Sequence, residues 1–139
     1  GEVAFGGNRV PMGTLSLPEG IKVIGERAFS QCPNLWIITI PSSVDSIGEY
    51  AFSYCRYLNV ASLKGGGKKL AFGAFFECEK LVAIELPQGM ESIGNIAFSH
   101  CTNLYSVSLP SSLQEVGFEA FKDCPCEKEV LQLVQKNKK

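Results

Sequence analysis

Matching residues recur along this chain at a fixed spacing of 23, and this repeat constrains the fold more than any other feature. An Ala-Phe pair recurs with a cysteine three residues beyond the phenylalanine. The phenylalanines are Phe29, Phe52, Phe75, Phe98 and Phe121, and the cysteines are Cys32, Cys55, Cys78, Cys101 and Cys124. A fixed period of this length predicts a solenoid, in which each unit buries its apolar side against identical neighbours. Such a fold favours a function carried on a surface.

The composition fits one folded domain and excludes two classes of function. The chain has 139 residues, 45% of them hydrophobic, which is ample for a core. Its net charge of −1 lacks the basic excess that nucleic-acid binding requires. No apolar run approaches the roughly 18 residues that a membrane-spanning helix needs. No secretory signal is visible, and because the chain opens on Gly1 without an initiating Met, this says nothing about an export signal upstream.

Each repeat predicts a short strand followed by turns. Ile38 and Ile40 alternate with other residues, a period of two that predicts a strand with one buried face. Pro41 follows and ends the strand, because proline lacks the N–H that a ladder needs. Gly48 then marks a sharp bend or a positive φ. The Ala-Phe-x-x-Cys segment fits one tight helical or 3₁₀ turn that drives the phenylalanine into the core.

The third repeat departs from this pattern. Its turn, residues 64–69, reads Lys-Gly-Gly-Gly-Lys-Lys in place of a proline turn. Gly67 occupies an apolar column, and Ala71 replaces the bend glycine. Because an apolar contact is lost, we expect this coil to be looser than its neighbours.

The two ends of the chain differ from the repeats between them. Ala4-Phe5, followed by Asn8, resembles a degraded repeat, so residues 1–14 are predicted to be a partial coil before five repeats in residues 15–126. In residues 127–139, a helix over about residues 127–135 is predicted to place Val130, Leu131 and Val134 on one face and cover the open end of the core. A solvated tail follows it.

Proline, Ile-Gly, Ala-Phe and Cys recur together at fixed offsets in residues 41–55 and 86–104. These segments resemble the BspA-like, or Treponema pallidum type, leucine-rich repeat over about residues 15–126. The resemblance implies a leucine-rich-repeat solenoid, mainly β, with right-handed coils of about 23 residues and a parallel sheet on the concave side. Members are typically cell-surface or secreted proteins of bacteria and some protists, and several are adhesins for host extracellular-matrix and plasma proteins.

The cysteines favour a reduced, buried ladder over disulfides or a metal site. Side chains in register in neighbouring coils run parallel, which holds their Cβ atoms farther apart than the roughly 3.5–4.5 Å of a disulfide. A linear column also cannot supply four converging zinc ligands. The column thiols are therefore expected to pack as small hydrophobes. Cys126 lies off the column and is the thiol expected to be most exposed.

No constellation for catalysis is visible, and we expect neither an enzyme nor a cofactor. His100 is the only histidine and occupies a variable, solvent-facing column, so neither a His-based triad nor a His-rich metal site can be assembled. Carboxylates are scattered singly. Residues 65–69 lack the spacing and the hydroxyl of a phosphate-binding loop. With Lys64 they form the strongest local positive patch, which could attract an acidic partner weakly.

The surface-facing positions of the strands are the candidate partner-binding site. Small and weakly polar residues there are flanked by aromatic residues, a combination that suits protein contacts. The candidates are Trp36, Ile37, Thr39, Asn59, Val60, Ser62, Val82, Ala83, Glu85, Tyr105, Ser106 and Ser108. The alternative is that a side chain such as Trp36 simply packs at the edge of a coil.

Two functions follow as hypotheses. The first is a non-enzymatic protein-binding domain of a cell-surface or secreted bacterial protein, an adhesin that binds a host extracellular-matrix or plasma protein and is itself a monomer. The second is a structural spacer or assembly element of a larger surface protein, which would stack end to end.

Overall fold

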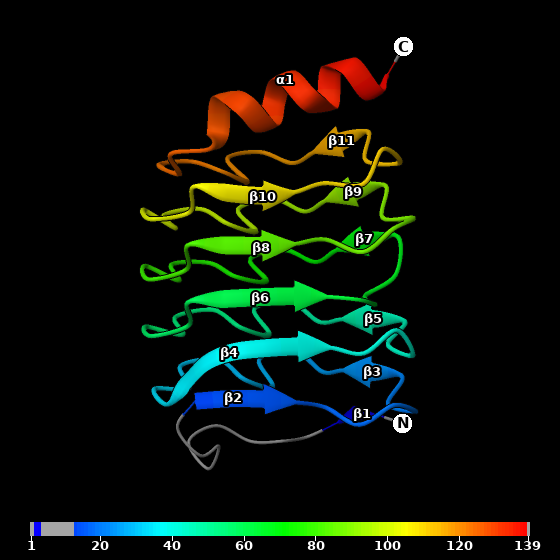
Figure 1. Ribbon diagram of the computed structural model, residues 1–139, viewed down its shortest axis with the longest axis vertical. Helices are drawn as coiled ribbons and strands as arrows, with labels where there is room; N and C mark the ends of the chain where they lie inside the picture. Colours follow the sequence, from blue (N-terminus) through cyan, green and yellow to red (C-terminus); the bar gives the residue numbers. More distant parts are fainter. Residues whose placement is uncertain (1, 4–12, 139) are drawn as a thin grey trace.

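The chain winds into a stack of coils, and most coils contribute one longer strand and one two-residue strand (Figure 1). The computed structural model describes residues 2–3 and 13–138. The longer strands are β2 (Gly13–Ser16), β4 (Leu35–Ile40), β6 (Val60–Leu63), β8 (Ala83–Glu85) and β10 (Ser106–Ser108). The short strands are β1 (Glu2–Val3), β3 (Val23–Ile24), β5 (Ser46–Ile47), β7 (Lys69–Leu70), β9 (Ser92–Ile93) and β11 (Glu115–Val116).

The longer strands form one parallel sheet in the order β10-β8-β6-β4-β2. Ile37 pairs with Val60, Val60 with Ala83, and Ala83 with Ser106. Each residue of these strands thus pairs with the residue 23 positions further along the chain. The short strands form two further parallel sheets, β1-β3-β5 and β7-β9-β11. The sequence period is thus the structural period, and the predicted solenoid is confirmed.

Stacked phenylalanines form the centre of the core. Phe52, Phe75 and Phe98 are fully buried, and neighbouring rings lie nearly parallel with their centroids 5.1 Å and 5.4 Å apart. The Ala-Phe-x-x-Cys segments are not continuous helix. Bonds such as Ala51 N–H to Gly48 O, 3.2 Å, close single turns, and alternate N–H groups such as that of Phe52 donate to the next coil instead.

The bend glycines do not take positive φ, so that part of the expectation is wrong. Left-handed backbone falls two residues later, at Tyr50 (φ 57°), and again at Tyr54 (φ 58°). The glycines instead permit close approach, because a Cβ atom at Gly48 would lie 2.6 Å from the backbone nitrogen of Glu26 in the preceding coil.

The row of short strands is interrupted between β5 and β7. Ala71, just after β7, stands where neighbouring coils have glycine. A Cβ atom at Gly94 would lie 2.7 Å from Leu70 O, and one at Gly117 would lie 2.6 Å from Asn95 N. A side chain at this position fits the missing pairing between β5 and β7, and that the third coil is looser than its neighbours stays a prediction.

The glycine turn of the third coil is not loose. Gly65 and Gly66 are buried. A Cβ atom at Gly65 would lie 2.8 Å from Val44 O, and Gly66 N–H donates to that same oxygen at 2.9 Å. Glycine here replaces the missing apolar contact with backbone packing against the second coil.

The helix α1 (Glu127–Asn137) crosses the C-terminal end of the stack, as Figure 1 shows. Val130 and Val134 are buried, but Leu131 is 49% exposed, so the predicted apolar face is wrong in that residue. The helix also runs past the predicted end, because the Asn137 side chain donates to Leu113 O at 3.0 Å and ties the last turn to the stack. No helix in residues 2–3 and 13–138 is long and apolar enough to span a membrane.

At the other end of the stack, β1 pairs in parallel with β3. The residues that suggested a degraded repeat, Ala4, Phe5 and Asn8, lie outside the described residues. The boundary between a partial coil and five repeats therefore stays a proposal.

Candidate functional site

The predicted binding residues form three rows along one face of the five-stranded sheet. The first row is Ile37, Val60, Ala83 and Ser106, and the second is Thr39, Ser62, Glu85 and Ser108. The third, at the start of the strands, is Trp36, Asn59, Val82 and Tyr105, joined by backbone bonds from each residue to the one in the preceding coil. The intervening residues, such as Ile38, are buried. The structure therefore brings all twelve candidates together.

Large apolar side chains on this face, which we call the sheet face, are open to solvent. Trp36 is 46% exposed, Ile37 41%, Val82 38% and Tyr105 64%. Trp36 and Ile37 are both exposed although they are adjacent, and the pairing of β4 with β2 shifts register at this position, as in a β-bulge. About half of Trp36 is therefore open to a partner, and its role in binding stays a prediction.

A cleft of about 320 Å³ opens beside Trp36. Trp36, Ile37, Tyr57, Asn59 and Lys80 line it. The Asn59 side chain donates to Lys80 O at 3.2 Å, which fixes one wall. Sequence reasoning missed Tyr57, which is 51% exposed, and Lys80. Their position in the repeat could have revealed them, because each stands at a variable position just before a core leucine, Leu58 or Leu81.

Glu85 gathers the polar contacts of the sheet face. Its Oε1 accepts from the Ser62 hydroxyl at 2.7 Å and from Lys64 Nζ at 3.2 Å. These two hydrogen bonds, and the charge of Lys64, hold the pKa of Glu85 below its ordinary value. Lys64 is thus partly neutralised, which weakens the positive patch predicted for its turn.

His100 is a partly exposed residue with a partner that the sequence did not reveal. Its Nδ1 lies 2.7 Å from Asp123 Oδ2, one coil further on in the same column. The expectation of a surface histidine is met, and the contact with Asp123 is an addition to it. Within the described part of the chain, no group of three or more His, Cys, Asp or Glu side chains is placed to hold a metal ion.

All six cysteines are buried and none is in a disulfide with another, so the predicted buried ladder is confirmed. The column thiols do more than fill space, because each of the last four donates to a phenylalanine carbonyl in the preceding coil, as Cys101 Sγ does to Phe75 O at 3.2 Å. Burial raises the pKa of Cys32 to about 11. The expected exposure of Cys126 is wrong: it is 3% exposed, at the N-cap position of α1, and its N–H donates to Leu104 O at 3.2 Å and ties it to the preceding coil.

A parallel sheet of in-phase 23-residue coils with a buried Leu, Ile and Phe core defines a leucine-rich-repeat solenoid. Residues 1–128 match the BspA type leucine rich repeat region in six copies, and the chain belongs to this family. Among curated proteins, none matches this chain.

Solved structures of bacterial leucine-rich-repeat proteins are similar to this chain. The Treponema pallidum leucine rich repeat protein is 35% identical, with a TM-score of 0.74 over 80% of this chain and 54% of that protein. A leucine-rich repeat protein from Eubacterium ventriosum is 28% identical, with a TM-score of 0.75 over 78% of this chain and 29% of the other. This chain therefore spans only part of the length of these relatives.

Proposed function

We propose that this chain is a non-enzymatic protein-binding domain of a bacterial cell-surface or secreted protein, and that it binds its partner through the sheet face. The observation that carries the proposal is the row of half-exposed apolar side chains there, above all Trp36 and Tyr105. Aromatic anchors surrounded by small residues are typical of protein interfaces. Solenoids commonly present such an extended surface.

The cleft beside Trp36 supports the same proposal. Its volume of about 320 Å³ can admit a bulky side chain of a partner. Trp36 and Tyr57 would contact that side chain, since both are about half exposed. Aromatic residues in such positions supply a large share of binding free energy at protein interfaces.

The kind of partner and the location rest on the family resemblance. Proteins with this type of repeat are typically exposed on cells or secreted, and several bind host proteins. We therefore propose a host extracellular-matrix or plasma protein as the partner, which would make the parent protein an adhesin.

Binding of the purified domain to immobilised fibronectin, fibrinogen and a wider panel of extracellular host proteins, at two salt concentrations, tests the proposal. Saturable binding is expected, and Trp36→Ala and Tyr105→Ala should each weaken it by about tenfold or more. The matched control is Phe118→Ala, because Phe118 is 70% exposed but lies beside the short strands, away from the sheet face. The proposal would be contradicted if all three variants lost the same amount of affinity, or if the domain bound none of the proteins in the panel.

A spacer that stacks end to end is not favoured. The helix α1 buries Val130 and Val134 against the last coil, so stacking at this end would have to displace it or build on its outer face. Light scattering tests this alternative, because a spacer of this kind would show a mass that rises with concentration.

A further inference from the structure

A second group of aromatic side chains lies on the turns that follow the short strands. We call Tyr50, Tyr54, Phe72, Phe76 and His100 the turn-face cluster. Tyr50 meets Phe72 edge-on with centroids 5.5 Å apart and Phe76 with centroids 6.3 Å apart, and Phe76 also contacts Tyr54 (5.5 Å) and His100 (6.0 Å). Tyr54 and Phe72 are more than a third exposed. The proposed function does not use these residues.

The cluster is built by two departures from the repeat. Gly73 (φ 63°) stands where other coils have Arg27, Tyr50, Ile96 and Glu119, and a Cβ atom there would lie 2.6 Å from the Tyr50 ring. Glycine thus makes the space that the ring occupies. Phe76 stands at a position that other coils fill with serine or lysine. Both changes are in the third repeat. Together they bring the Phe76 ring into contact with the rings of Tyr50 and Tyr54.

One cation already binds to this surface from within the chain. The guanidinium of Arg27 lies 4.5 Å from the centroid of the Tyr50 ring and 3.7 Å from the Glu26 carboxylate. A ring face attracts a cation through its quadrupole, and an adjacent carboxylate adds to the attraction. Arg27 therefore shows which chemical group this surface accommodates.

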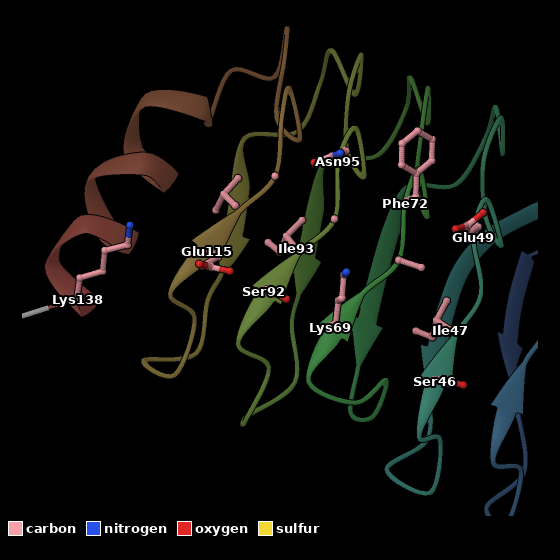
Figure 2. A pocket seen from close by; sticks show the side chains of 14 residues that line it. Ser46, Ile47, Glu49, Lys69, Phe72, Ser92, Ile93, Asn95, Glu115 and Lys138 are labelled. Carbon is pink, nitrogen blue, oxygen red and sulfur yellow. The ribbon is translucent and has the colours of Figure 1, made fainter.

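A carboxylate and an aromatic ring also stand in neighbouring coils one coil further on, and in the described part of the chain no cation pairs with that carboxylate, Glu49. Glu49 and Phe72 occupy, in the second and third coils, the column that begins with Glu26. They lie side by side at one end of an open groove of about 790 Å³ along the short strands (Figure 2). Lys69 and, at the opposite end, Lys138 line the same groove (Figure 2), but within the described residues neither forms an ion pair with Glu49.

The other charges nearby leave the Phe72 end as the better place for a cation. His100 is paired with Asp123, and Lys122 with Glu119. Arg56 lines a small cavity together with Tyr54, so it disfavours a second cation there. Glu77, next to Phe76 in the chain, has no ion pair in the described part of the structure and adds negative charge to this turn.

We propose that the turn-face cluster is a second partner-binding surface, and that it takes an arginine-bearing basic segment of a protein, with one guanidinium between the Phe72 ring and the Glu49 carboxylate. A planar guanidinium can stack on a ring and donate to a carboxylate at once, which favours arginine over lysine. The rings are already in place, so binding costs little side-chain entropy.

Fluorescence anisotropy with a labelled synthetic peptide of alternating glycine and arginine tests this proposal. The intact chain should bind the peptide saturably, and a peptide with the neutral analogue citrulline should bind about tenfold more weakly or not at all. Phe72→Ala and Glu49→Gln should each weaken arginine-peptide binding about two- to fivefold. Higher salt should weaken binding to the wild type more than binding to Glu49→Gln.

Phe118→Ala is the matched control. Phe118 occupies the same repeat position as Phe72 and is more exposed, but its neighbour in the preceding coil is Asn95 and not a carboxylate. Phe118→Ala should bind the peptide like the wild type, and so should Trp36→Ala, which separates this surface from the sheet face. Equal binding of the citrulline peptide, or equal losses in Phe72→Ala and Phe118→Ala, would overturn the proposal. Since Phe72 also contacts Tyr50, thermal unfolding of each variant must confirm that it is folded, and Glu49→Gln tests the site without altering the rings.

Discussion

Replacing single thiols of the buried ladder tests whether they act as hydrogen-bond donors or only as small apolar groups. Cys78 and Cys101 are both fully buried at the same repeat position. Cys78 Sγ donates to Phe52 O at 3.1 Å, and no second donor reaches that oxygen within the described residues. Cys101 Sγ donates to Phe75 O at 3.2 Å, but this oxygen also accepts from the Cys78 N–H at 3.3 Å.

Alanine at either position removes one buried sulfur, which is comparable to a methylene and is worth about 1 kcal/mol. Cys78→Ala in addition leaves a buried carbonyl without a partner, which costs about 1–3 kcal/mol, at the low end here because a thiol is a weak donor. We therefore expect Cys78→Ala to lower the free energy of unfolding by about 2–3 kcal/mol and Cys101→Ala by about 1–1.5 kcal/mol.

Urea denaturation followed by circular dichroism measures both values, and an unchanged m-value shows that the same surface unfolds in each variant. The difference of about 1 kcal/mol between two otherwise equivalent positions is the decisive quantity. Equal losses of unfolding free energy would show that the thiols act only as apolar groups. A larger loss for Cys101→Ala would refute the argument that only Cys78→Ala leaves a carbonyl without a donor.

Three further predictions follow from the fold. Because burial raises the pKa of Cys32 from 9.0 to about 11, the unfolded chain loses this proton first, and the contribution of this thiol to the free energy of unfolding should fall between pH 9 and 11 by up to about 1.4 kcal/mol per pH unit, as the difference between urea titrations of the wild type and Cys32→Ala in that range would measure. Val134→Asp should destabilise the chain by more than about 2 kcal/mol, whereas Leu131→Asp, three residues earlier on the exposed side of the helix, should stay within about 0.5 kcal/mol in the same assay. Gly94→Ala should cost about 1–3 kcal/mol, because its Cβ would press on Leu70 O, and the thermal midpoint should fall accordingly.

Most of the fold can be predicted from the sequence because residues at the same repeat position have the same surroundings in every coil. A column that holds phenylalanine in each repeat, such as that of Phe75, must face the common core. A single copy carries no such redundancy. The burial of Cys126 and the exposure of Leu131 depend on how the one helix sits on the stack, which its own pattern of apolar residues does not determine.

Backbone conformation was harder to predict than burial. Glycine at position 48 suggested positive φ, but what the position requires is close contact with the backbone of the preceding coil. Left-handed backbone falls instead on residues with side chains, such as Tyr50 and Tyr54. Each of these two residues donates its N–H to the next coil, so the stacking bonds support a conformation that local propensity disfavours.

The two candidate surfaces differed in how far the sequence revealed them. The rows of the sheet face follow from strand alternation and the 23-residue period, which together are enough to place Ile37 beside Val60. The turn-face cluster does not follow in this way, because Tyr50 and Phe76 are 26 residues apart in different columns of the repeat. Their contact depends on the space at Gly73, which is visible only in three dimensions.

Departures from the repeat are where a solenoid of this kind can acquire specificity. Residues that recur in every coil, such as Phe52 and Phe75, are explained by packing and cannot distinguish one partner from another. Trp36 and the pair Gly73 and Phe76 occur once each at their positions, and each changes the exposed surface while the buried columns continue through it. A variant with Phe76→Ser, the residue of the two neighbouring coils, should therefore remain folded, because the phenylalanine core is untouched. It should nevertheless lose the edge contacts to Tyr50 and Tyr54 and, with them, part of the arginine-peptide binding; undiminished binding would show that the cluster is not the site.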